Sequence, residues 1–491
     1  MMRRTFFLAL MFGLGVEFSF SQRILTLNES IAIAQSESYS IQNANLTLTS
    51  QQKTLRAAKL GLLSTVDLSI DAPRHNRLLS PQFDPASQLT QFYQIGETRL
   101  EGRLSINQPL IVTNGTISIL GSFFGRDQFS EIKGTNRDYL SNVSVQLVQP
   151  LFTPNSQQIQ LHQAELNLDR AKGSYSKAHL DIVYNVTLAF YNLYRLTQGA
   201  EIASTDVKQR EDSYNTAVNK FKAGVIPEVE MLKLEVELAS SRNDLLNRLA
   251  DLDAAKNSFK VLIGLQLEEQ ISVVSDSTVP AIAIDSAKAI REALANRVEL
   301  KNADIDRQLR EFDVITTNAQ RSIKANLIAN YGLSRNDDQV RDVFHDFNKT
   351  RSVILTLSLP IWDWGRNRTA TEAAEANLKN AELSYANQEM QIKQDILDLL
   401  NRIRVANSRL EVTRKGEELA QKSYAISVER FKAGSIKSDE LVQEQRRLTE
   451  AKINRLNALF DLRISLSDLT RKTFWDFEKN SPVQVVPTGE E

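Results

Sequence analysis

The chain has 491 residues, and its 59 lysines and arginines almost balance its 60 aspartates and glutamates. This near-neutral charge gives no indication of a nucleic acid or an anionic membrane surface as partner. The chain has no cysteine, which excludes disulfides and a lipid-modified N-terminal Cys, and no stretch after Ser21 is long and apolar enough to predict a transmembrane helix.

The N-terminus has the pattern of an export signal. Arg3 and Arg4 precede an apolar run over residues 6–16, and Ser19 and Ser21 lie at positions −3 and −1 relative to Gln22. The apolar run is too short to span a bilayer, so we predict a secretory signal peptide over residues 1–21. An exported chain without a spanning helix would enter a membrane only as β-structure.

The remaining sequence contains a tandem duplication. SYNTAVNKFKAG at 213–224 matches SYAISVERFKAG at 423–434, 210 positions later, and the same offset pairs Pro150 with Pro360 and Leu252 with Leu462. Such a repeat predicts two equivalent structural units. We divide the chain into a first repeat (22–267), a linker (268–284), a second repeat (285–474) and a C-terminal tail (475–491).

Each repeat begins with a helix and continues into β-strands. In the second repeat, helical spacing over 285–320 gives way to alternating apolar and polar residues, which predicts a β-hairpin over 322–360. The first repeat alternates in the same way around Val66–Ile70 and Val143–Leu147. One apolar and one polar face suit a sheet between lipid and water, but a strand pair that covers a soluble core would show the same pattern.

The first repeat carries an insertion. ALANRVELKNA at 293–303 resembles AQSESYSIQNA at 34–44 at an offset of 259, so the first repeat has 259 − 210 = 49 extra residues. We expect an added hairpin at about 73–125, with a polar loop from Pro73 to Glu97. Its strands, Leu100–Val112 and Thr116–Phe124, flank an Asn114-Gly115 turn.

Two very long helices follow the strands, over 155–222 and 366–432, where proline is absent. Ile392, Ile396, Leu399 and Ile403 recur at coiled-coil spacing. Gly224 and Gly434 end these helices and predict positive-φ caps for two tight turns, at 221–227 and 431–437. A cytoskeletal or adaptor-type coiled coil is the alternative interpretation, although strands interrupt both repeats.

Chemistry-bearing motifs are missing from the sequence. With four histidines, no HExxH spacing, no phosphate-binding glycine loop and no nucleophile elbow, we expect no catalytic, cofactor or metal site and no enzyme activity.

The signal peptide, the duplicated strand–helix unit, the F-K-A-G-x-I turns and LSLPIWDWGRNR (357–368) together resemble the TolC-type outer membrane efflux protein family, the outer membrane factors. The resemblance implies an α+β membrane protein of tandem-duplicated strand–long-helix units. As a homotrimer it would form one shared transmembrane β-barrel in the outer membrane lipid of a Gram-negative-type cell. Its long coiled-coil α-helical tunnel would place most of the chain in the periplasm.

The implied function is a passive exit duct of a tripartite efflux or type I secretion system. An inner-membrane pump and a periplasmic adaptor (membrane fusion protein) would deliver the cargo, and drugs, metal ions, siderophores and polypeptides all fit such a duct. The alternative is a periplasmic coiled-coil adaptor or scaffold without a pore.

The resemblance also implies three sets of site residues. The adaptor would dock at the turn residues, which otherwise are simple helix caps: Phe221, Ala223, Gly224, Ile226, Phe431, Ala433, Gly434 and Ile436. A periplasmic gate would use residues at the start of the helix after the second turn: Asp439, Glu440 and Gln443. The alternative is that Asp439 and Glu440 are solvated acids that the helix dipole favours in a first turn. Aromatic residues at the strand–helix junctions would lie at the membrane interface or serve only in packing: Phe152, Trp362 and Trp364.

Overall fold

The computed structural model describes residues 23–84, 87–131, 134–274 and 284–483. The signal peptide predicted over residues 1–21 lies outside the described residues. Within the described ranges, no helix combines the length and apolarity that crossing a membrane requires.

The chain forms two compact units. Of the described residues, one unit contains those up to Asn45, those within Tyr175–Arg297 and those from Gln391 onward; the other contains those within Leu46–Ser174 and Val298–Met390. The second is called the sheet unit below and the first the helical unit.

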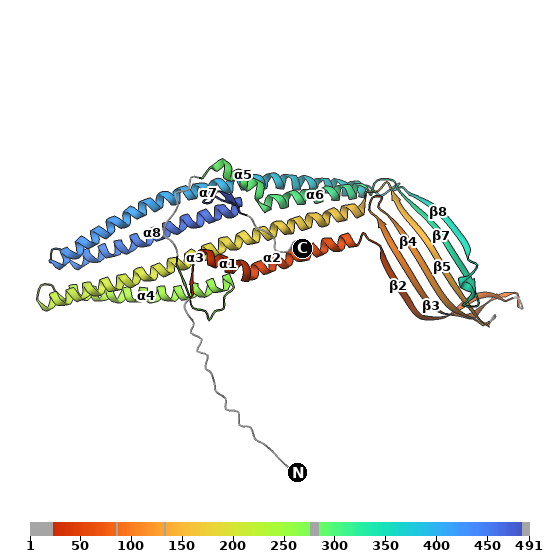
Figure 1. Cartoon of the computed structure of the whole chain (residues 1–491), viewed down its shortest axis with the longest axis horizontal. Helices are drawn as coiled ribbons and strands as arrows, with labels where there is room; N and C mark the ends of the chain where they lie inside the picture. Colours follow the sequence, from red (N-terminus) through yellow and green to blue (C-terminus); the bar gives the residue numbers. More distant parts are fainter. Residues whose placement is uncertain (1–22, 85–86, 132–133, 275–283, 484–491) are drawn as a thin grey trace, which may run out of the picture. The chain divides into compact units, whose positions relative to one another are not determined.

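The sheet unit contains one antiparallel sheet with the strand order β2-β3-β4-β5-β7-β8 (Figure 1). The strands are β2 (Thr65–Asp84), β3 (Leu89–Leu110), β4 (Gly115–Ser130), β5 (Gly134–Leu151), β7 (Lys324–Asp337) and β8 (Asn348–Ser358). A short 3-10 helix, η1 (Asp342–Phe344), lies in the connection between β7 and β8. The edges of the sheet are β2 and β8.

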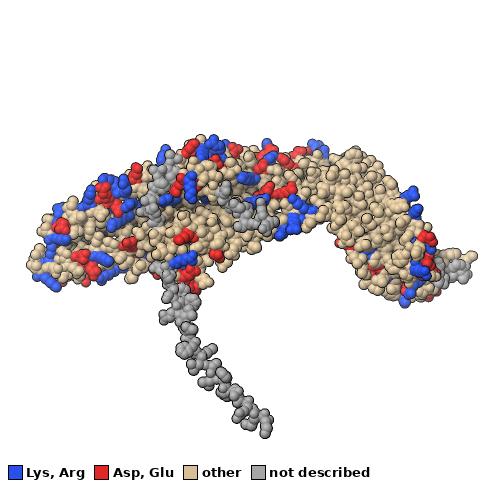
Figure 2. All heavy atoms as spheres, viewed as in Figure 1, with Lys and Arg blue, Asp and Glu red and all other residues tan. Residues whose placement is uncertain are grey.

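The two faces of this sheet differ in polarity. One register row joins Val66, Ile106, Ile119 and Val145, whereas a row of the opposite parity joins Ser69, Arg103, Ser122 and Asn142. The apolar face is exposed in the single chain, with large side chains open at Val66, Leu68, Leu104, Ile119, Val145, Val353 and Leu355. In Figure 2, charged residues are sparse over much of the sheet and gather at one end of its strands. An exposed apolar surface that continues across several strands marks an interaction with lipid or protein.

The expected loop from Pro73 to Glu97 is wrong. Strands β2 and β3 pair from Thr65–Asn107 to Asp84–Leu89, through most of that range. Pro73 falls in the register shift between Asp71 and Arg74, and Pro81 lies on the edge strand β2. Proline has no backbone N–H to donate. It is tolerated at a bulge, where the ladder is interrupted, and on an edge strand, where that position can face away from the neighbouring strand.

The helices repeat with constant offsets. The longest are α3 (Ser156–Lys222) and α7 (Arg366–Lys432), each of 67 residues, followed by α4 (Glu228–Ile263) and α8 (Ser438–Thr473), each of 36. Both pairs have bounds 210 positions apart. Before the strands lie α1 (Leu27–Glu37), α2 (Tyr39–Leu60), α5 (Ser286–Asn296) and α6 (Val298–Asn318).

The continuous helix expected over 285–320 is wrong, since α5 ends at Asn296 and Arg297 separates it from α6. Arg297 has an extended backbone (φ −63°, ψ 125°), and its guanidinium lies 3.0 Å from a carboxylate oxygen of Asp395. Ser38, 259 positions earlier, is extended in the same way between α1 and α2 (φ −62°, ψ 130°). Neither break contains the Gly or Pro that would have indicated it.

The core of the helical unit lies among α3, α4 and α8. Val186, Phe190 and Ile263 are fully buried, and the rings of Phe190 and Phe259 lie 6.2 Å apart. A parallel pair of short strands, β1 (Arg23–Leu25) and β6 (Ile271–Val273), packs against this core, and β9 (Trp475–Asp476) pairs with β10 (Ser481–Pro482). The predicted coiled-coil residues of α7 are buried at Ile392, Ile396, Leu399 and Ile403.

Candidate functional site: the paired helical turns

The turns that join α3 to α4 and α7 to α8 have the same backbone. Gly224 has φ +72° and Gly434 has φ +77°, which confirms the predicted positive-φ caps. In the first turn the Gly224 N–H donates to the Phe221 carbonyl (2.8 Å) and the Val225 N–H to the Lys220 carbonyl (2.9 Å). The second turn repeats both bonds 210 positions later, at 3.0 and 2.9 Å. Each helix therefore ends in a Schellman motif.

The side chains of the two turns are placed differently. Phe431 is 4% exposed, whereas Phe221 at the equivalent position is 37% exposed. Phe431 packs in a cluster with Ala217, Leu234 and Leu441, residues that come from both repeats. The Lys220 ammonium lies 4.6 Å from the centre of the Phe431 ring and donates to the Phe431 carbonyl. The two turns are thus joined within one chain.

Polar contacts at the starts of α4 and α8 reinforce this joint. The Ser438 hydroxyl donates to Glu230, and the Lys233 ammonium lies 3.3 Å from Glu230 and 3.1 Å from Asp439. The bond from Ser438, followed by that from Lys233, lowers the pKa of Glu230 below its usual 4.5. The hydrogen bonds to Asp439 and then Glu230 raise the pKa of Lys233.

A second polar layer lies further along the same helices. Arg210, whose side chain is 9% exposed, donates to Asp206 at 2.7 Å and to Glu237 at 2.5 Å. Thr449 of α8 donates to Asp206, and Arg446 of α8 donates to Glu237. Because each carboxylate accepts from both repeats, this network orients α8 against α3 and α4.

The predicted docking residues fall into three groups by exposure. Ala223, Gly224, Ala433 and Gly434 are exposed, and the half-buried Ile226 and Ile436 border the Phe431 cluster. Phe431 itself is buried, so it supports the turn from inside and offers no side-chain surface. The exposed apolar surface comes from the first turn, where Val225 accompanies Phe221.

The gate candidates lie in the first turns of α8 and are all exposed in the single chain: Asp439, Glu440 and Gln443. Asp439 differs from the other two because it forms the ion pair with Lys233. No local sequence pattern indicates this contact, because it joins residues 206 positions apart.

The junction aromatics are strongly exposed. Phe152 lies between β5 and α3, while Trp362 and Trp364 lie between β8 and α7, with ring centres 5.4 Å apart. Trp364 is 89% exposed, and both Trp364 and Phe152 have positive φ. Exposed indoles at a strand end suit a lipid–water interface.

Asn114 also belongs to this junction. It is the last residue of the β3–β4 turn, with φ +62°; its side chain donates to the Pro154 carbonyl at 3.3 Å and accepts from the Ser156 hydroxyl at 3.0 Å. The turn is thereby fastened to the start of α3. The predicted two-residue Asn114-Gly115 turn is wrong in its extent, because the turn spans residues 111–114 and Gly115 already pairs with Leu110. The sequence also gave no sign of the contacts between Asn114 and the start of α3.

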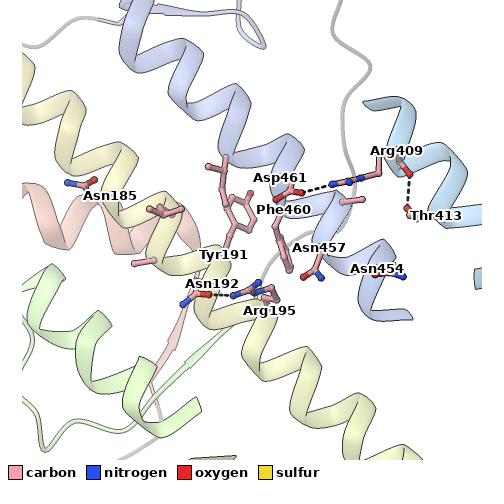
Figure 3. A pocket seen from close by; sticks show the side chains of 14 residues that line it. Asn185, Tyr191, Asn192, Arg195, Arg409, Thr413, Asn454, Asn457, Phe460 and Asp461 are labelled. Atoms are coloured by element: carbon pink, nitrogen blue, oxygen red, sulfur yellow. Dashed lines mark hydrogen bonds and ion pairs between the residues drawn. The ribbon is translucent and has the colours of Figure 1, made fainter. Parts of the chain in front are cut away.

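A cavity of about 970 Å³ lies among α3, α7 and α8 in the helical unit (Figure 3). Its wall mixes amide, guanidinium and aromatic groups: Asn192 accepts from Arg195 at 2.7 Å, and Arg409 lies 3.6 Å from Asp461. Sequence reasoning missed this cavity because its residues come from three helices and form no motif. In the described part of the chain, no three His, Asp or Glu side chains gather as metal ligands would.

Comparisons with known proteins agree with this architecture. The sequence model of the family described as "Outer membrane efflux protein" matches residues 119–265 and 289–473. The chain is 21% identical to "Probable outer membrane lipoprotein SilC" of Salmonella typhimurium over 45% of this chain and 48% of that protein. It is 20% identical to "Nodulation protein T" of Rhizobium leguminosarum bv. trifolii over 58% of this chain and 61% of that protein. The matches thus span about half the length of these relatives.

Among solved structures, the CmeC outer membrane channel of Campylobacter jejuni superposes with a TM-score of 0.69 at 14% identity, covering 94% of this chain and 87% of that one. A likeness at this identity shows a shared fold over nearly the whole chain.

Proposed function

Because the chain belongs to the outer membrane efflux protein family, whose place is the outer membrane, we propose that it is the exit duct of a tripartite efflux or type I secretion system. The observation that carries the proposal is the sheet with one polar and one exposed apolar face, built into the same repeats as the paired helical turns. Lipid would cover the apolar face and water the polar face.

The sheet also supports a homotrimer. It is open, with β2 and β8 at its edges, and an open edge cannot remain unpaired in hydrocarbon. Six strands form too narrow a barrel to leave a channel, so several copies must share one barrel, and pairing of β2 with β8 of the next copy would close it. Phe152, Trp362 and Trp364 would then lie at the membrane interface.

The helical turns supply the other end of the duct. We propose that the exposed apolar surface of Phe221 and Val225 docks a periplasmic adaptor (membrane fusion protein), through which an inner-membrane pump delivers cargo. Threefold symmetry would bring three copies of Glu440 towards one axis as a gate. Passage through such a duct requires no catalytic group or cofactor from this chain.

Fractionation and purification test the proposal. The chain should be recovered in the outer membrane, run in detergent at about three times its chain mass, and conduct ions in planar bilayers. Recovery only in the soluble periplasmic fraction, as a monomer without conductance, would instead assign it to the adaptor or scaffold class.

A further inference from the structure

We infer that three copies of this chain close an eighteen-stranded barrel, whose membrane section passes bulky hydrated cargo without selecting it by charge sign. The inference rests on the proposed trimeric duct and adds to it the width and lining of the pore. The strand count follows from three chains with six strands each in one sheet.

Two of the six strands are additions to the repeat. β2 begins at Thr65 and β7 at Lys324, 259 positions later, while β5 (Gly134–Leu151) overlaps β8 (Asn348–Ser358) at the offset of 210. In the second repeat, β7 is therefore the counterpart of β2, and β8 is the counterpart of β5. β3 and β4 have none, so they are the insertion of 259 − 210 = 49 residues.

The added hairpin lies inside the sheet, between β2 and β5. β3 pairs with β2 from Asn107 to Leu89, and β4 pairs with β5 from Thr116 to Ser130. A hairpin added outside the wall or folded into the lumen would leave β2 bonded directly to β5. Here, removing it would break both ladders, so both added strands belong to the wall.

The added strands also carry the same facial pattern as their neighbours. Leu100, Leu104 and Ile117 are exposed on the apolar face, whereas Arg103 and Ser122 share the polar face. Asn114 fixes the hairpin's turn to the start of α3, so the hairpin is anchored at the same end of the sheet as the long helix.

The added strands widen the pore substantially. Strands about 4.8 Å apart and tilted by about 40° give a backbone diameter of about 36 Å for eighteen strands, against about 24 Å for the twelve that three chains would form without the insertion. The cross-section grows about 2-fold, and barrels of about 16–18 strands leave an aqueous channel.

The charges on the polar face of the added hairpin are compensated. Arg103 lies 2.6 Å from Asp71, Arg99 lies 2.9 Å from Glu101, and Arg126 makes two bonds to Asp138, at 3.0 and 2.7 Å. Paired charges of both signs produce a field that fades within a short distance of the wall. A wide, wet lumen of this kind favours large polar cargo that keeps its hydration shell.

The chain has no cysteine, which allows a clean labelling test in intact outer membranes. Ser122→Cys places a thiol on the polar face of the added strand β4, and Ile119→Cys places one on its apolar face as the matched control. Each would react with a small charged maleimide or with a maleimide-linked polymer of about 20 Å hydrated diameter, which fits the wider pore and not the narrower one.

We expect both reagents to label Ser122→Cys to a similar extent, at least 10-fold more than Ile119→Cys. Labelling of Ser122→Cys by the small reagent alone would mean a narrower pore and would overturn the inference while leaving the duct intact. Equal labelling of both positions by the small reagent would mean that lipid covers neither face, and the proposed function itself would fail. Disulfide trimers from a cysteine in β2 and another in β8 would independently identify the edges that join the copies.

Discussion

The two helical turns have the same backbone and different surroundings. Both end a helix of 67 residues with a positive-φ glycine and the same pair of capping bonds. Yet Phe431 is buried while Phe221 is partly exposed, and Glu230 is bonded to Ser438 while the equivalent Glu440 is exposed. The two turns keep the same backbone geometry, but their side chains differ. Phe431 of the second turn packs against residues of the first repeat, whereas the equivalent Phe221 does not belong to that buried cluster.

The comparison predicts unequal effects of equal mutations. Phe431→Ala removes a buried ring from a cluster that joins both repeats and should lower the local unfolding free energy of the turns by about 3–4 kcal/mol. Phe221→Ala removes a ring that is already in contact with water and should cost less than about 1 kcal/mol. Hydrogen exchange of the amides in 221–227 and 431–437 measures both, and similar values for the two variants would remove the distinction between the turns.

Substitution of the cap glycines should affect both turns alike. A Cβ at Gly224 would meet no atom within 4 Å, so the cost of Gly224→Val arises from its positive φ, as it does for Gly434→Val. Each should cost at least about 1–2 kcal/mol and weaken cross-linking to the adaptor, while trimer formation survives. Asn tolerates positive φ, so Gly224→Asn is the matched control. Unchanged cross-linking in Gly434→Val would refute docking at that turn.

The joint between the turns should loosen in acid. The pKa of Glu230 is lowered in the folded chain, so this carboxylate stabilises the joint above its unfolded value of 4.5, and the contribution is lost as pH falls through the lower folded value. The rate at which a protease cleaves the turns should rise between about pH 5 and about pH 3 in the wild type, and this rise should be smaller in Glu230→Gln and Ser438→Ala. Identical profiles in all three would assign no role to the carboxylate.

The smallest effect on stability is expected at Glu440, which is exposed at the second turn. Glu440→Ala should leave the fold and trimer unchanged but alter single-channel conductance and weaken block by multivalent cations. Asp439→Ala is the comparator, because it also releases Lys233 and should loosen the joint. Conductance and cation block equal to wild type in Glu440→Ala would leave this carboxylate as an ordinary solvated acid.

The features that could be predicted from the sequence are those that depend on a periodic pattern or on the properties of a single residue. The absence of proline gave the extents of the long helices, Gly224 and Gly434 gave the caps, and alternation gave the hairpin of the second repeat. Proline misled over 73–97, because the sequence alone does not reveal that Pro81 lies on an edge strand, where it is allowed.

The joint between the turns was beyond sequence reasoning. Phe221 and Phe431 occupy the same motif, and nothing local distinguishes the buried ring from the open one. The difference arises from partners such as Lys220, which bonds to a carbonyl 211 positions away. The helix breaks at Ser38 and Arg297 were missed for a related reason. Each break consists of one residue with an extended backbone, and neither residue is the Gly or Pro that usually indicates a helix end.

The matched lengths of α3 and α7 limit how the gene can change. A helix advances about 1.5 Å and rotates about 100° per residue, so deleting one residue from α7 alone would swing Phe431 away from Ala217 and Leu234. Substitutions can accumulate independently in each repeat, but an insertion or deletion in one long helix survives only with its counterpart in the other. Helix length is therefore inherited as a paired trait, even where the two sequences have drifted apart.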